Sequence, residues 1–174
     1  MVIPIKFGTD GWRAMIAKEF TVENVARVAQ GTASWVIAQG LPKVAVVGHD
    51  CRFGGPLFAD TVAQVFLQNG FEVHLAEGPV TTPMVSLGAK ELKTGIGVII
   101  TASHNPATDN GFKLKGNHGG PLLEADVKAV ETHIPDTIDF DLEAIILDDY
   151  RASGNLKTAE LEDMFVEKVE ANFD

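Results

Sequence analysis

Residues 97–106 read GVIITASHNP, an apolar run that passes directly into a short polar turn. Such a run, rich in β-branched residues, predicts a strand that is buried on both faces, as in a parallel sheet. Comparable runs alternate with helical repeats on its N-terminal side, and a shorter strand follows it. We expect helices over 21–39, 56–69 and 82–92, and strands over 44–47, 71–75, 97–101 and 111–114. This alternation predicts an α/β fold, a three-layer α/β/α domain with a mixed, mostly parallel sheet.

The C-terminal third differs in composition, because the acidic excess lies almost entirely beyond residue 100. Helical spacing there predicts helices over 122–133, 139–150 and 158–173. Leu161, Phe165 and Val169 lie on one face of the last helix, and we expect that face to be exposed. We therefore assign residues 1–157 to one domain and residues 158–174 to a helix that leads toward a second domain, which this chain lacks.

Composition excludes several classes of protein. The chain has 174 residues, of which 45% are hydrophobic and 22% charged, values typical of a globular protein. No apolar run is long enough to span a membrane, and the N-terminus lacks the basic lead-in of a signal peptide. The single cysteine, Cys51, fits a reducing compartment, so we expect a cytoplasmic protein. A net charge of −10 without a basic cluster argues against a nucleic-acid partner.

Two polar loops, at 48–55 and 101–110, follow expected strands, at the edge where α/β sheets bind their ligands. In the second loop Ser103 lies just past the strand, His104 is adjacent, and Lys113 follows on the next strand. A hydroxyl, an imidazole and an ammonium group together suit acyl or phosphoryl transfer. Spacing alone leaves open the alternative that this segment is only a polar turn.

Residues 7–13, FGTDGWR, form a further polar segment, in which two glycines permit tight turns. Arg13 offers a planar guanidinium group suited to phosphate. The alternative is an ordinary N-terminal loop with a surface arginine. We expect Trp12 to pack and order this loop. We expect His74 and His133 to be structural or solvated, and His118, beside Gly119-Gly120, to be a turn residue.

Four segments together resemble the N-terminal domain of the α-D-phosphohexomutases, the phosphoglucomutase/phosphomannomutase family. They are FGTDGWR at 7–13, GHDCR at 48–52, TASHNP at 101–106, and NGFK at 110–113 followed by Gly119-Gly120. The resemblance implies that Ser103 is phosphorylated, donates its phosphoryl group and binds Mg²⁺ through one phosphate oxygen. It implies that His104 and Arg13 assist near the phosphoserine and that Lys113 is a candidate general acid/base.

The implied enzyme is an intramolecular phosphotransferase that interconverts hexose 1-phosphate and hexose 6-phosphate, of glucose and/or mannose, through a bisphosphate. Its implied partners are hexose phosphate, hexose bisphosphate and the missing downstream domains. The family's metal loop, sugar-selecting loop and C-terminal phosphate-binding loop do not occur in this chain. The chain then covers roughly the first third of such an enzyme, and we expect it to be inactive alone. Asp109, where the family commonly has an aromatic residue, and Ala14, where glycine is common, depart from the pattern.

Two other functions are compatible with these segments. A small hydrolase could use Ser103 with His104, but adjacent residues of an extended loop point apart, and no acidic residue is evidently placed to orient the imidazole. A non-catalytic module could bind a sugar phosphate or a partner chain through the same loops. A turnover assay with glucose 1-phosphate distinguishes these alternatives.

Overall fold

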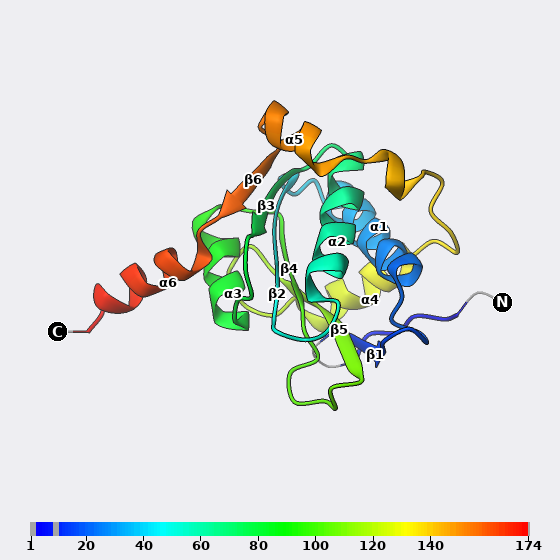
Figure 1. Ribbon diagram of the computed structural model, residues 1–174, viewed down its shortest axis with the longest axis horizontal. Helices are drawn as coiled ribbons and strands as arrows, with labels where there is room; N and C mark the ends of the chain where they lie inside the picture. Colours follow the sequence, from blue (N-terminus) through cyan, green and yellow to red (C-terminus); the bar gives the residue numbers. More distant parts are fainter. Residues whose placement is uncertain (1–2, 9–10, 174) are drawn as a thin grey trace.

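A six-stranded sheet forms the centre of the computed structural model, which describes residues 3–8 and 11–173 (Figure 1). The strands lie in the order β1-β5-β4-β2-β3-β6. Neighbours from β4 to β6 pair in parallel, whereas β5 is antiparallel to both β4 and β1. The bounds are β1 Trp12–Met15, β2 Val44–His49, β3 Glu72–Ala76, β4 Ile96–Ile100, β5 Asp109–Lys115 and β6 Leu156–Ala159.

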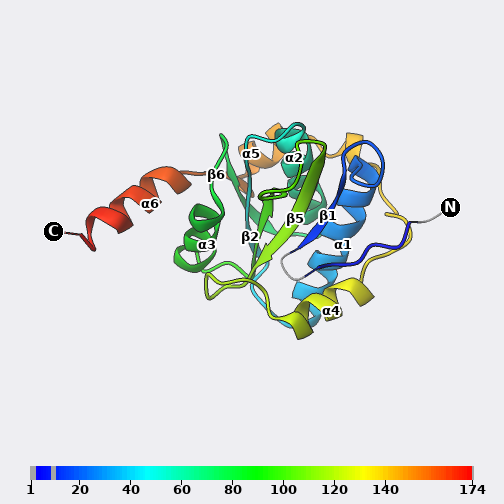
Figure 2. The same cartoon turned by 90° about the horizontal axis from the view of Figure 1, so that it is seen from below.

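Helices cover both faces of this sheet (Figure 2). They are α1 Val22–Ala38, α2 Gly55–Gln68, α3 Thr82–Glu91, α4 Glu124–Thr132, α5 Leu147–Ser153 and α6 Leu161–Glu170, with the 3₁₀ turn η1 at Leu142–Ala144. Successive residues of β2 point to opposite faces, as a strand requires. Val47 packs in the larger core with α1 and α2, and Val46 packs with Val85 and Ala89 of α3. The predicted three-layer fold with a mixed, mostly parallel sheet is confirmed.

Trp12 and Arg13, expected within the polar loop at 7–13, belong instead to the edge strand β1. They pair with β5, with Trp12 opposite Phe112. Four residues are too few to show a strand period in the sequence, so only pairing with β5 reveals them. Trp12 is buried and stacks on Phe20 at 4.8 Å between ring centroids, which confirms its expected packing role.

The C-terminal third also departs from the expected helices. The helix expected over 139–150 is replaced by η1 and α5, and the last helix begins at Leu161 because residues 156–159 pair with β3 as β6. Leu161, expected to be exposed, is buried: it packs so closely on α3 that a Cβ at Gly88 would lie 2.6 Å from its Cδ2. Phe165 is half-buried and Val169 exposed on a helix that projects from one end of the molecule (Figures 1 and 2).

None of the helices formed by the described residues is both long and apolar enough to cross a bilayer. The division into a domain over residues 1–157 and a leading helix over residues 158–174 stays a prediction.

Candidate active site

The loop that follows β4 presents Ser103 to solvent. Hydrogen bonding continues one residue past the strand, since Thr101 N donates to the Gly111 carbonyl at 2.9 Å. Ser103 then adopts a φ of +58°, in the left-handed region that residues with a side chain rarely occupy. Its N–H donates to Thr101 Oγ1 at 3.0 Å. The serine backbone is thus strained and held by a side chain two residues earlier.

The loop that follows β2 reaches this turn through Asp50. One oxygen of its carboxylate, Oδ2, accepts the Thr101 hydroxyl hydrogen bond, and the other, Oδ1, accepts from the N–H of Arg52 at 2.9 Å. Since β2 and β4 are parallel neighbours, their C-terminal ends meet at one edge of the sheet. The two polar loops predicted from the sequence are therefore in direct contact.

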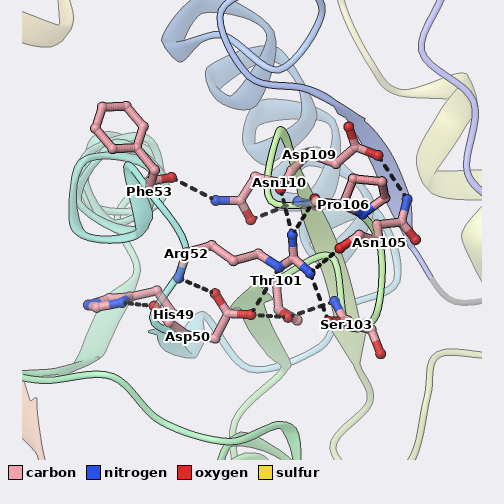
Figure 3. A network of polar contacts seen from close by, with 11 residues as sticks. His49, Asp50, Arg52, Phe53, Thr101, Ser103, Asn105, Pro106, Asp109 and Asn110 are labelled. Carbon is pink, nitrogen blue, oxygen red and sulfur yellow. Dashed lines mark hydrogen bonds and ion pairs between the residues drawn. The ribbon is translucent and has the colours of Figure 1, made fainter.

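Arg52 makes the most extensive contact between the two loops (Figure 3). Its guanidinium group donates four hydrogen bonds, all to backbone carbonyl oxygens of residues 101–109, which we call the serine loop and which end at the first residue of β5. The distances are 2.8 Å to Ser103, Asn105 and Pro106, and 2.9 Å to Asp109. Its Nε lies 3.5 Å from Asp50 Oδ2, and only 14% of the side chain is exposed.

Arg13 lies on β1 and Lys113 on β5, the two strands at the antiparallel side of the sheet. Arg13 lies opposite Gly111, so Arg13, Gly111 and Lys113 share one face of the sheet. A Cβ at Gly111 would lie 2.4 Å from the Thr101 carbonyl oxygen and 3.1 Å from Arg13 Cγ. Arg13 therefore lies close to Gly111, and at ordinary strand spacing it is ~10 Å from Thr101, two strands away. Lys113 is buried, whereas Arg13 is half-buried.

His104 is exposed beside Ser103. Neither its ring nor the Ser103 hydroxyl has a hydrogen-bond partner among the described residues. A serine–histidine hydrolase needs that hydrogen bond, so the geometry of this part of the chain does not favour such an enzyme. Two other histidines are structural, as expected: His74 Nε2 contacts Glu72 at 2.8 Å, and His133 Nδ1 donates to the Ala129 carbonyl at 2.8 Å.

Ligands for Mg²⁺ are few in this region. Among residues 3–8 and 11–173, no group of three or more His, Cys, Asp or Glu could hold a metal ion. The Asp50 carboxylate is already engaged by Thr101 and Arg52. Because Mg²⁺ prefers six oxygen ligands, these residues do not form a magnesium site by themselves, and a phosphate on Ser103 would add only part of one.

The sequence and the family resemblance indicate Ser103, Lys113, His104 and Arg13 but give no role to Asp50, Arg52 or Asn110. Asn110 is fully buried, donates to the Phe53 carbonyl at 3.2 Å and accepts from Gly111 N at 2.8 Å. The available signal was an Asp-x-Arg triplet directly after a buried strand, at the edge where the serine was expected. Asp109, a departure from the family pattern, accepts from Asn105 Nδ2 at 3.0 Å and so supports the same loop.

Comparisons with known proteins match most of the chain. The model of the phosphoglucomutase/phosphomannomutase alpha/beta/alpha domain I matches residues 4–139. A phosphoribomutase of Saccharomyces cerevisiae is 40% identical over 147 residues, and a phosphoglucosamine mutase of Zymomonas mobilis is 38% identical over 130 residues. These alignments cover 80% and 74% of this chain but only 23% and 29% of those relatives.

A solved structure gives the same result. The crystal structure of a Thermus thermophilus protein assigned as a phosphomannomutase superposes with a TM-score of 0.88 at 34% identity. The superposition covers 100% of this chain and 37% of that one. The chain thus spans well under half the length of each of these similar proteins.

Proposed function

The chain belongs to the phosphoglucomutase/phosphomannomutase family, as its α/β/α domain I, and on this basis we propose that Ser103 is the phosphoryl carrier of a hexose phosphomutase. The observation that carries the proposal is the state of Ser103: exposed, left-handed, and held through both of its peptide groups by side chains of two loops. Backbone strain of this kind concentrates at functional sites.

The chemistry follows from charge and position. In the transfer step the bond between phosphorus and Ser103 Oγ breaks, and a hydroxyl oxygen of the sugar phosphate forms the new bond to phosphorus. Such transfer depends on positioning and charge neutralisation rather than on covalent help from the protein. A phosphoserine carries about −1.5 to −2 charge at pH 7, which Arg13 would help to offset, with His104 assisting beside it. In the proposal Lys113 is the general acid/base: its free amine accepts the proton that the attacking hydroxyl loses and becomes an ammonium group.

The substrate is proposed to be a hexose phosphate, of glucose or mannose, that turns over through a bisphosphate. The similar proteins carry names with ribose and glucosamine as well, and this supports a phosphorylated sugar more firmly than a particular one. Mg²⁺ belongs to the proposal only as a partner of the Ser103 phosphate, with its other ligands from downstream domains. The proposed setting is the cytoplasm.

Mass spectrometry tests the proposal directly. The protein at its natural length is incubated with glucose 1,6-bisphosphate, and phosphate is mapped on its peptides, with Ser103→Ala as the control. We expect one phosphate, on the peptide that contains Ser103, and none in the control. Phosphate on another residue only would contradict the proposal, and sugar-phosphate binding without phosphate incorporation would favour the non-catalytic module.

A further inference from the structure

We infer that Arg52 is the positioning residue of the serine loop: its guanidinium group holds Ser103 in the strained geometry required for phosphoryl transfer. The inference rests on the proposed function for its kinetic consequence, whereas its structural part stands on the hydrogen bonds alone. Arg52 does not touch the reacting atoms, because every hydrogen bond it donates to the serine loop ends on a backbone carbonyl oxygen (Figure 3).

The first step of the argument concerns the strain at Ser103. A left-handed conformation costs a residue with a side chain about 1–2 kcal/mol, so its surroundings must enforce it. Here the N–H of Ser103 donates to Thr101 Oγ1, and its carbonyl accepts from Arg52 Nη2 at 2.8 Å. Thr101 is itself fixed by Asp50. Both peptide groups of Ser103 are therefore anchored, directly or through Thr101, to the loop after β2.

The second step concerns the number of contacts from one side chain. Nη2 bonds the Ser103 and Asn105 carbonyls, and Nη1 bonds the two further along the loop, those of Pro106 and Asp109. A planar guanidinium presents five N–H donors in a fixed arrangement, which a flexible lysine ammonium with three donors cannot reproduce. With 14% of its side chain exposed and Asp50 as its ion-pair partner, Arg52 is confined to this one orientation.

The third step concerns the reaction. Four carbonyl oxygens of the loop turn toward the guanidinium group, so their partial negative charges are engaged there by a cation. Without Arg52 these carbonyls would need other donors, and the left-handed turn at Ser103 would relax. Because a misplacement of ~1 Å can cost ~10²-fold in rate, relaxation of this turn should lower turnover more than it lowers substrate binding.

The test uses the protein at its natural length with Arg52→Lys, which keeps the charge but loses the planar group. Arg52→Gln is the second variant, and Arg151→Lys is the matched control, because Arg151 pairs with exposed Asp148 on α5. Amide hydrogen exchange is followed at Ser103, Asn105 and Asp109, whose N–H groups bond within the loop. Steady-state mutase kinetics with glucose 1-phosphate give kcat and KM separately.

In Arg52→Lys or Arg52→Gln we expect exchange at those three amides to rise at least tenfold while exchange in β4 stays unchanged. We expect kcat to fall ~10²-fold with KM within about threefold, and Arg151→Lys to change neither. Unchanged exchange in the loop, or an unchanged kcat, would overturn the inference. Absence of turnover in the unsubstituted protein would refute the proposed function instead, and the exchange data alone would then decide whether Arg52 holds the loop.

Discussion

Replacement of Ser103 by glycine should stabilise the fold relative to replacement by alanine, although both changes abolish the proposed phosphorylation. The reason is the φ of +58° at this position, which glycine adopts freely and alanine does not. The Ser103 hydroxyl has no hydrogen-bond partner among the described residues, so Ser103→Ala removes no contact within this part of the chain. The pair of variants therefore isolates the backbone strain from the side chain.

The size of the effect follows from two opposing contributions to the free energy of unfolding. Relief of the left-handed strain is worth about 1–2 kcal/mol. Glycine has greater freedom in the unfolded chain, which offsets about 0.5–1 kcal/mol of that gain. At the midpoints of these two ranges the glycine variant should be more stable than the alanine variant by ~0.75 kcal/mol, which for a chain of this size raises the Tm by ~1.5–3 °C. Ser103→Ala itself should stay within ~0.5 kcal/mol of the natural protein.

Thermal unfolding followed by circular dichroism measures these differences. Lys93 supplies the control, because it is exposed, has a φ of +51° and lies at the end of α3, outside the serine loop. Lys93→Gly should exceed Lys93→Ala in Tm by a similar margin and leave phosphorylation of Ser103 intact. If the Lys93 pair shows the gain and the Ser103 pair does not, Ser103 carries no such strain and the reasoning is refuted.

Two further expectations concern charged residues. Lys113→Met should lower kcat by ~10²–10³-fold in steady-state assays, the usual cost of losing a transition-state charge partner, and a normal kcat would rule out Lys113 as acid/base. The hydrogen bond from Lys157, followed by that from His74, holds the pKa of the Glu72 carboxyl below its usual value. The stabilisation that this lowered pKa gives the folded protein is fully present above the pKa that Glu72 has in the unfolded chain. It is lost as the pH falls through the pKa that Glu72 has in the folded protein. Glu72→Gln should therefore lower the free energy of unfolding by ~0.5 kcal/mol at pH 7, a small loss because both side chains of the Glu72–Lys157 pair are partly exposed. In strong acid, where Glu72 is protonated in both states, the substitution should change nothing. Urea unfolding at pH 7 and in acid checks this.

The central layers of the fold could be predicted because their signals are local. Buried strands such as β4 are rich in β-branched residues and contain no charged residue. Thr21 caps the start of α1, since its side chain accepts from Asn24 N at 3.2 Å as a capping residue should. The two edge strands could not be predicted in this way. β1 and β6 have four residues each, and each is a strand only because β5 or β3 offers an edge to pair with.

The candidate site was predictable in its chemistry but not in its architecture. The sequence indicates Ser103 and Lys113 because a hydroxyl and an ammonium group beside the end of a strand suit acyl or phosphoryl transfer. The sequence indicates Arg52 only as part of a motif, since its role depends on four backbone carbonyls that belong to another loop. A contact between a side chain and distant backbone atoms leaves no periodic trace in the sequence.

The sheet switches from parallel to antiparallel pairing between β4 and β5. This switch explains why Arg13 and Lys113 lie on the strands next to the one that ends at the serine loop. Parallel pairing of β2 with β4 places Asp50 and Arg52 beside the start of the serine loop. The chain then returns antiparallel through β5, so that Lys113 lies opposite Ile99, on the strand that ends at this loop. β1 adds antiparallel to β5 and brings Arg13 level with Gly111, where no side chain intervenes. A parallel β5 would require a long crossover connection from β4 and would reverse the direction of the strand that carries Lys113. The antiparallel strands β5 and β1 therefore allow one sheet to place Lys113 and Arg13 on the strands beside the loop that holds Ser103.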